Sequence, residues 1–275
     1  MKSGSKALKS FIFSVVIFLR SRVLLEFLKA IRLIRIKEIE HILNPNIIRN
    51  HSKTQLKRNI IACRGKSGES LMVDINDVIG YKYWNSGERD PQITKLCQKF
   101  CAFEGAVFLD VGANIGTTSV APAIKSHCKV ICIEASKLHI SLLSDNLYSN
   151  NIHSLIFHCA VTSPEKCRIN KELNLFVSPG NTGASSLFAS WNTSQVDSVV
   201  ERVPTSTIDS CLSFSKENID LVGLAKIDIE GGEYDALLGA DLIVGKVPLI
   251  VEYIHDSNSS KKLVELLQLH YELFS

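Results

Sequence analysis

The sequence of 275 residues has no CxxC pair, no internal repeat and no apolar run long enough to span a membrane. Its eight cysteines are scattered from position 63 to position 211, several of them inside apolar runs. Disulfide frameworks and zinc fingers need tighter clusters, so the spacing argues against both. We therefore expect no metal site and reduced, mostly buried thiols, as in a cytoplasmic protein.

The N-terminal arm, residues 1–44, is basic and amphipathic. Residues 1–37 carry nine Lys or Arg and one acid. Because the whole chain has a net charge of only +3, the rest of the chain is mildly acidic. The apolar stretch 11–19, FIFSVVIFL, is half the roughly 20 residues of a spanning helix, and no small-residue cleavage site follows it. Apolar side chains then recur at helical spacing from Val23 to Ile34. Residues 1–40 either dock peripherally on the inner face of the membrane or pack on the main domain.

The body, residues 45–275, is predicted to be α/β, with a doubly wound, mostly parallel sheet. Near-continuous apolar runs favour strands buried on both faces. Residues 60–84 are interpreted as short strands around a Gly65–Gly68 turn, and residues 162–207 as an insertion of hairpins and loops. Main-sheet strands are expected within 106–112, 129–135, 154–161, 221–233 and 248–254. Helices are expected over 91–103, 116–126, 137–149, 233–240 and 260–269.

The stretch VFLDVGANIG (107–116) ends an apolar strand with an acid and two glycines. Gly112 and Gly116 follow the pattern G-x-x-x-G, which differs from the G-x-G-x-x-G of dinucleotide-binding loops. Asp110 could order the turn or hold a cationic centre. Glu134, at the end of the next strand, could accept hydrogen bonds from a ribose. The pattern indicates a nucleoside without a diphosphate, such as S-adenosylmethionine; the alternative is a tight turn with a surface Glu.

Several stretches resemble the FkbM family of S-adenosylmethionine-dependent methyltransferases. They are FLDVGANIG (108–116), VICIEAS (130–136), NTGASSL (181–187), VPTSTIDSCL (203–212), KIDIEGGEYDALLGA (226–240) and LIVEYIH (249–255). The resemblance implies the class I methyltransferase fold and methylation of hydroxyl groups on sugars, glycans or polyketide-type natural products.

The resemblance also implies where particular residues lie. Asp110, Gly112, Asn114 and Gly116 would lie at the methionine end of the cofactor, Glu134 at the ribose, and His158 to Val161, including Ala160, at the adenine. Asp228, Glu230 and Glu233 would face the methyl donor, with Glu252 and His255 at the end of the next strand.

Methylation of an alcohol needs a base, or a metal ion that lowers the pKa of the hydroxyl. Asp228, Glu230 and His255 are the candidate bases. Asp228 could instead orient the cofactor's amino group, Glu233 could cap a helix, and His255 could be a surface residue. Asn181 and Ser185 could line an acceptor pocket or belong to a flexible loop. Trp84 and Trp191 could stack on a sugar or pack in the interior.

The sequence therefore predicts an O-methyltransferase with S-adenosylmethionine as its cofactor. HYELFS (270–275) resembles the start of a sixth strand and no seventh follows, so the alternative is a truncated or non-catalytic cofactor-binding protein at the membrane. A nucleic-acid methyltransferase is disfavoured, because Ile229–Gly232 stand where an aromatic Pro-Pro-Tyr-type clamp would be and the body is acidic.

Overall fold

The computed structural model describes residues 58–188, 199–253 and 258–274. Contacts divide the chain into two units, Met1–Leu56 and Lys57–Ser275. The basic arm, Trp191 and His255 lie outside the described residues, so the predictions that concern them stay predictions. Within the described ranges, no helix is both long and apolar enough to cross a membrane.

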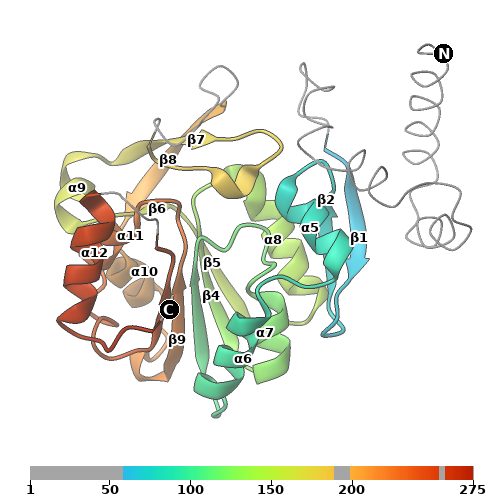
Figure 1. The fold of residues 1–275 in the computed structure, drawn as a ribbon, viewed down its shortest axis with the longest axis horizontal. Helices are drawn as coiled ribbons and strands as arrows, with labels where there is room; N and C mark the ends of the chain where they lie inside the picture. The colour runs from blue at the N-terminus through green and yellow to red at the C-terminus, as the bar shows by residue number, and fades with distance from the viewer. Residues whose placement is uncertain (1–57, 189–198, 254–257, 275) are drawn as a thin grey trace, which may run out of the picture. The chain divides into compact units, whose positions relative to one another are not determined.

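The second unit is built on a sheet of five parallel strands (Figure 1) in the order β10-β9-β3-β4-β5. Their bounds are Val107–Val111 (β3), Lys129–Glu134 (β4), Ser154–His158 (β5), Val222–Ile227 (β9) and Leu249–Val251 (β10). The chain starts in the middle of the sheet with β3, moves outward to β5, and returns to the other side of β3 with β9. The predicted doubly wound fold is confirmed, and its switch point lies between β3 and β9.

Helices cover both faces of this sheet. One face packs against α6 (Pro91–Phe100), α7 (Val120–Ser126) and α8 (Lys137–Ser149), and the other against α10 (Ile208–Ser215), α11 (Glu233–Leu237) and α12 (Asn258–Gln268). Side chains of β3 alternate between the two cores, with Phe108 in the first and Leu109 in the second. All five residues of β3 are buried, as a strand covered on both faces requires.

Local sequence explains where several of these helices begin. Pro91 supplies the first residue of α6 with its φ already fixed. Ser136 caps α8, since its side chain accepts the Leu138 N–H, and Thr207 caps α10 by accepting the Ser210 N–H. The structure confirms the helix predicted over 137–149 to the residue.

Two smaller antiparallel hairpins flank the main sheet. β1 (Ile60–Arg64) pairs with β2 (Ser70–Asp74), as the Gly65–Gly68 turn predicts. In the insertion, β7 (Glu172–Val177) pairs with β8 (Val199–Ser206), which also pairs in parallel with the short β6 (Ala160–Val161). The insertion also contains α9 (Pro164–Ile169) and a 3₁₀ turn, Thr182–Ala184.

Three expectations need correction. Residues 78–84 belong to a helix, α5 (Val78–Ser86), rather than to a strand, because Asp77 caps it through the Ile79 N–H and Gly87 ends it at φ 71°. The strand expected over 154–161 is divided, and β6 leaves the main sheet to pair with the insertion. The described part of 270–275 forms no strand; instead the Tyr271 hydroxyl accepts the Gly245 N–H at 2.7 Å.

The cysteines lie where the sequence predicts. All eight are free of disulfides, and every one except the half-buried Cys167 is buried.

Candidate active site

The turn after β3 is shaped by the lack of a side chain at Gly112. Its φ is 79°, a left-handed conformation that residues with a Cβ adopt at a cost. A Cβ at Gly112 would also lie 1.9 Å from the carbonyl oxygen of Asp228. This glycine therefore allows the ends of β3 and β9 to approach at the switch point, where ligands bind in such sheets.

Asp110 lies beneath this turn and is fully buried. Lys226 Nζ donates to Asp110 Oδ1 at 3.0 Å and to the Gly112 carbonyl oxygen at 3.1 Å. The hydroxyls of Thr118 and Ser119 donate to Asp110 Oδ2 at 3.0 and 2.6 Å. Asp110 therefore orders the turn from behind.

Lys226 is the cation of this network and is also buried, with 3% of its side chain exposed. Burial disfavours its charge, but the charges of Asp110 and Asp228 outweigh that effect and raise its pKa. Lys226 Nζ lies 3.5 Å from Asp228 Oδ2. One ammonium thus links the acid under the glycine turn to the acid at the end of β9.

Glu134, the last residue of β4, is held by hydrogen-bond donors from three directions. Its Oε2 accepts the Asn114 N–H at 2.7 Å, and its Oε1 accepts the Ser136 N–H at 2.7 Å. His139 Nδ1 lies 3.2 Å from Oε1. Burial alone would raise the pKa of Glu134, but these contacts, that of His139 foremost, hold its pKa below the usual value. Glu134 is therefore a pre-oriented carboxylate.

A cavity opens beside Glu134. Its lining includes Gly112, Asn114, Glu134, Ala160 and Ser185. A carboxylate has about four acceptor positions, of which the contacts of Glu134 use three, so one remains for a ribose hydroxyl. These residues fit the adenosyl part of S-adenosylmethionine.

A second cavity adjoins the first and has polar walls. The two share part of their lining, namely Gly112, Asn114, Gly183, Asp228 and Glu230. Charged and amide side chains that line only the second are Lys82, Arg89, Asn181, Lys226 and Glu252. This arrangement suits a cofactor in one cavity and an acceptor in the other, with Asp228 and Glu230 at their junction.

Three carboxylates gather at that junction. One oxygen from each of Asp228, Glu230 and Glu252 lies within 4.8 Å of the others. Burial, followed by the charge of Asp228, raises the pKa of Glu230 to about 7 and that of Glu252 to about 8. Oxygen ligands so arranged could hold a hard divalent cation, and without one Glu230 and Glu252 have pKa values suited to proton transfer near neutral pH.

The loop between β9 and α11 gives Glu230 its position. Glu230 has φ 53°, so the strand alternation ends there and Glu230 can line the same cavities as Asp228. Glu233 is buried, and its Oε1 accepts the N–H groups of Ile229 and Gly231 at 3.0 and 3.1 Å. Glu233 therefore holds the loop before α11, a structural role that differs from the helix cap considered for it.

The segment 181–187 forms one wall of the site. The Thr182 N–H donates to Asp77 Oδ2 at 2.6 Å, and the Ser186 hydroxyl donates to the Glu230 carbonyl oxygen at 2.8 Å. Asn181 lines the second cavity, whereas Ser185 lines the first and donates its hydroxyl to the Thr182 carbonyl oxygen. The segment is thus tied to both α5 and the Glu230 loop.

Most of the residues singled out in the sequence come together here. Gly112, Asn114, Glu134, Ala160, Asp228 and Glu230 line one cavity or both, but Asp110 and Gly116 lie outside the lining of each. Gly116 has φ 87° and lies against Leu143 of α8, so it serves helix packing. Trp84 packs against the hydrophobic core.

Sequence reasoning missed Lys226. The signal for it is a lone charged residue inside the apolar strand VGLAKI.

A sheet wound in this order, with a glycine turn after its first strand and an acid closing the second, defines a class I methyltransferase. The model of the Methyltransferase FkbM domain matches residues 110–273, and the chain belongs to this family. Its cofactor is S-adenosylmethionine.

Other comparisons add only distant likenesses. No curated protein matches the sequence. A precorrin-6y C5,15-methyltransferase from Geobacter metallireducens is 12% identical over 65% of this chain and 70% of its own, with a TM-score of 0.34. The TYW2 protein of M. jannaschii, in complex with AdoMet, is 19% identical over 37% of this chain and 44% of its own, with a TM-score of 0.30.

A third solved structure is the tRNA (uracil-54, C5)-methyltransferase of Pyrococcus abyssi in complex with S-adenosyl-L-homocysteine. It is 18% identical over 37% of this chain and 24% of its own, with a TM-score of 0.28. The chain thus spans less than half the length of this protein and of TYW2. At these TM-scores the three structures do not inform the choice of acceptor.

Proposed function

We propose that this protein transfers a methyl group from S-adenosylmethionine to a hydroxyl of a sugar, glycan or natural product. The observation that carries the proposal is the set of acids at the junction of the two cavities. Asp228, Glu230 and Glu252 face the space between a nucleoside-binding wall and a second, polar cavity. A hydroxyl acceptor needs such a base, because an alcohol holds its proton tightly.

The cofactor supplies a methyl group already activated on a sulfonium sulfur. The protein must hold the acceptor oxygen in line with that methyl group and take its proton. Glu134 would fix the ribose, while Asp228, oriented by Lys226 at 3.5 Å, would accept the hydrogen bond of the acceptor hydroxyl. Asp228 would take that proton as the oxygen–carbon bond forms, and Glu230, whose pKa is about 7, lies close enough to share it.

The composition of the cavity walls also favours a hydroxylated acceptor over a nucleobase. The described lining of the two cavities contains no Phe, Tyr or Trp. Flipped or single-stranded bases are usually held by stacking on such rings. Amide, hydroxyl and charged groups line the second cavity instead, and these can hydrogen-bond to several hydroxyls at once.

The test measures transfer of labelled methyl groups from S-adenosylmethionine to a panel of sugars, oligosaccharides, amines and tRNA, with cofactor binding followed by calorimetry. Asp228→Ala should lower turnover by about 10²-fold or more and leave cofactor affinity within a few fold. Asp220→Asn is the matched control, because Asp220 is an exposed acid at the opposite end of β9. It should leave both measurements unchanged.

The outcomes separate the candidate functions. Transfer to hydroxyl acceptors that depends on Asp228 supports the proposal. Transfer to amines or tRNA alone would replace O-methylation with another methyl transfer. Cofactor binding without transfer to any acceptor would favour the non-catalytic alternative.

A further inference from the structure

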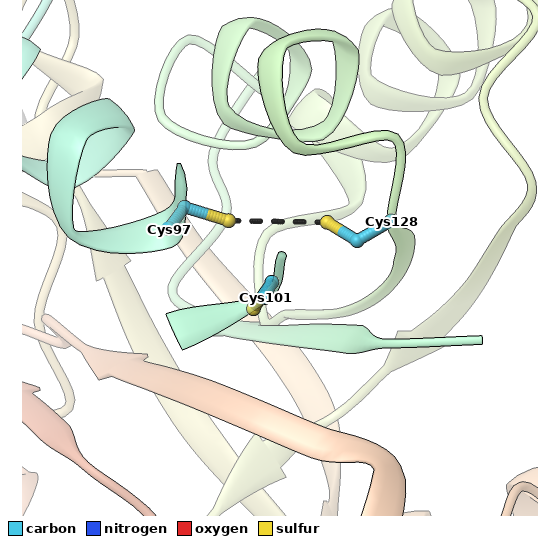
Figure 2. Close-up of side chains that lie close together, drawn as sticks. All are labelled: Cys97, Cys101 and Cys128. Carbon is cyan, nitrogen blue, oxygen red and sulfur yellow. Dashed lines mark hydrogen bonds between the residues drawn. The ribbon is translucent and has the colours of Figure 1, made fainter. Parts of the chain in front are cut away.

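Three cysteine side chains converge at the edge of the sheet opposite to the candidate active site. Cys97 lies in the last turn of α6, Cys101 is its C-cap residue, and Cys128 directly precedes β4. Figure 2 shows the sulfurs of Cys97 and Cys128 facing each other, with Cys101 beside them. Cys97 and Cys101 are four residues apart and so share one face of the helix, whereas Cys128 comes from the loop after α7.

The separation of the sulfurs matches a metal site. Sγ of Cys97 and Sγ of Cys128 are 3.8 Å apart, and all three sulfurs lie within 4.8 Å of one another. In a tetrahedral site with metal–sulfur bonds of about 2.3 Å, two sulfurs are about 3.8 Å apart. A disulfide would need about 2.05 Å, so these sulfurs are spaced for an ion between them rather than for a covalent bond.

The surroundings of the cluster favour a ligand as well. Cys97 and Cys101 have no exposed surface, and Cys128 is 7% exposed. The Ser126 hydroxyl lies beside the Cys97 thiol, yet this buried oxygen makes no hydrogen bond of ordinary geometry within the described part of the chain. A buried hydroxyl without a partner is costly, and a metal ion could use its oxygen.

Three sulfur ligands also indicate which kind of metal ion fits the cluster. Thiolates select soft ions such as zinc over magnesium or calcium.

We propose that Cys97, Cys101 and Cys128 form a three-thiolate site for a soft metal ion, zinc in the first instance. Binding would form three metal–sulfur bonds and release the thiol protons to solvent. The Ser126 oxygen or a water molecule would take the fourth position. The ion would join the end of α6 to the start of β4, at the far end of the strands that carry the methyltransferase site.

The test uses Cd²⁺ as a spectroscopic probe on the full-length chain, purified under reducing conditions and stripped of metal. We expect one Cd²⁺ per chain, a sulfur-to-cadmium charge-transfer band in the ultraviolet, and displacement of the probe by Zn²⁺. Cys97→Ala and Cys128→Ala should each weaken binding by about 100-fold or more, since even partners that only orient a ligand are worth 10–100-fold.

A second buried pair of thiols provides the matched control. Sγ of Cys159 and Sγ of Cys211 are 3.7 Å apart and buried, but a third sulfur does not join them among the described residues. Cys159→Ala and Cys211→Ala should leave the band and the stoichiometry intact. A band lost equally in these variants would overturn the proposal.

The wild-type chain tests the site even if a cysteine variant fails to fold. Zinc should raise its melting temperature, because an ion that binds only the folded state stabilises it. Absence of the cadmium band in the reduced wild-type chain would refute the site. So would isolation of the chain with a Cys97–Cys128 disulfide and no bound metal.

Discussion

Replacement of Lys226 by methionine should strongly destabilise the domain. Methionine keeps the length of the side chain but removes the ammonium, which donates to Asp110 at 3.0 Å and to the Gly112 carbonyl oxygen at 3.1 Å. Asp110 has no exposed surface and Lys226 only 3%. The variant therefore leaves a carboxylate buried without its cation.

The expected loss is about 3–5 kcal/mol of unfolding free energy, which is typical when one partner of a buried pair is removed. In a domain of this size each kcal/mol lowers the melting temperature by about 2–4 °C, so the shift should be about 6–20 °C. Asp110→Asn combined with Lys226→Met removes both charges. This double variant should recover most of the loss, because the amide oxygen of the new asparagine can still accept hydrogen bonds from Thr118 and Ser119.

Chemical denaturation of the wild type, both single variants and the double variant gives the coupling between the two residues. The control is Arg202→Met, which breaks the exposed pair with Glu172, where 76% and 46% of the side chains are accessible. Surface pairs contribute at most about 1 kcal/mol. A loss below about 1 kcal/mol in Lys226→Met, or a double variant as unstable as Lys226→Met, would refute the assigned role.

Three further predictions concern the site. Gly112→Ala should cost several times more stability than Gly68→Ala, because Gly68 has φ 96° but open space around it. Equal shifts in thermal melting would contradict the argument that β3 and β9 approach too closely at Gly112 for a side chain. Turnover should rise as pH passes 7–8, where Glu230 and Glu252 ionise. Stability should fall from about pH 4.5, the ordinary pKa of a glutamate, up to pH 7–8 and then level off, because both folded-state pKa values are raised; a flat pH profile in both measurements would count against these acids. Glu134→Gln should weaken cofactor binding about 10–100-fold in calorimetry, as loss of a charged hydrogen bond implies; an unchanged affinity would exclude the ribose contact.

The parts of the fold that follow local rules could be predicted from the sequence. The helix Lys137–Ser149 is flanked by its Ser136 cap and has a clear apolar face, and the central strands are short apolar runs ended by acids or glycines. The helix Val78–Ser86 is not predicted, because its apolar residues follow β2 closely and resemble a strand; the cap at Asp77 is the signal that identifies it. The break at Cys159 depends on pairing with β8, which lies far along the chain.

The residues of the candidate site also divide into those that local sequence predicts and those that depend on distant contacts. Gly112, Asn114 and Glu134 follow strand ends, and the topology of the sheet brings strand ends together. The role of Lys226 depends on an acid 116 residues away, and the cysteine group depends on contacts between positions 31 residues apart. Contacts of this kind follow from the packing of α6 against α7 and of β3 against β9, so spacing in the sequence does not reveal them.

The two cavities share part of their lining, but α5 and the loop after it line only the second. The first cavity is lined by the ends of β3 and β4, by β6 and by part of the segment 182–187. Substitutions in α5 or at Arg89 can therefore change acceptor preference without altering the lining of the first cavity. Evolution, or a designer exchanging these segments between relatives, can alter the chemistry of the recipient while the donor half is inherited intact.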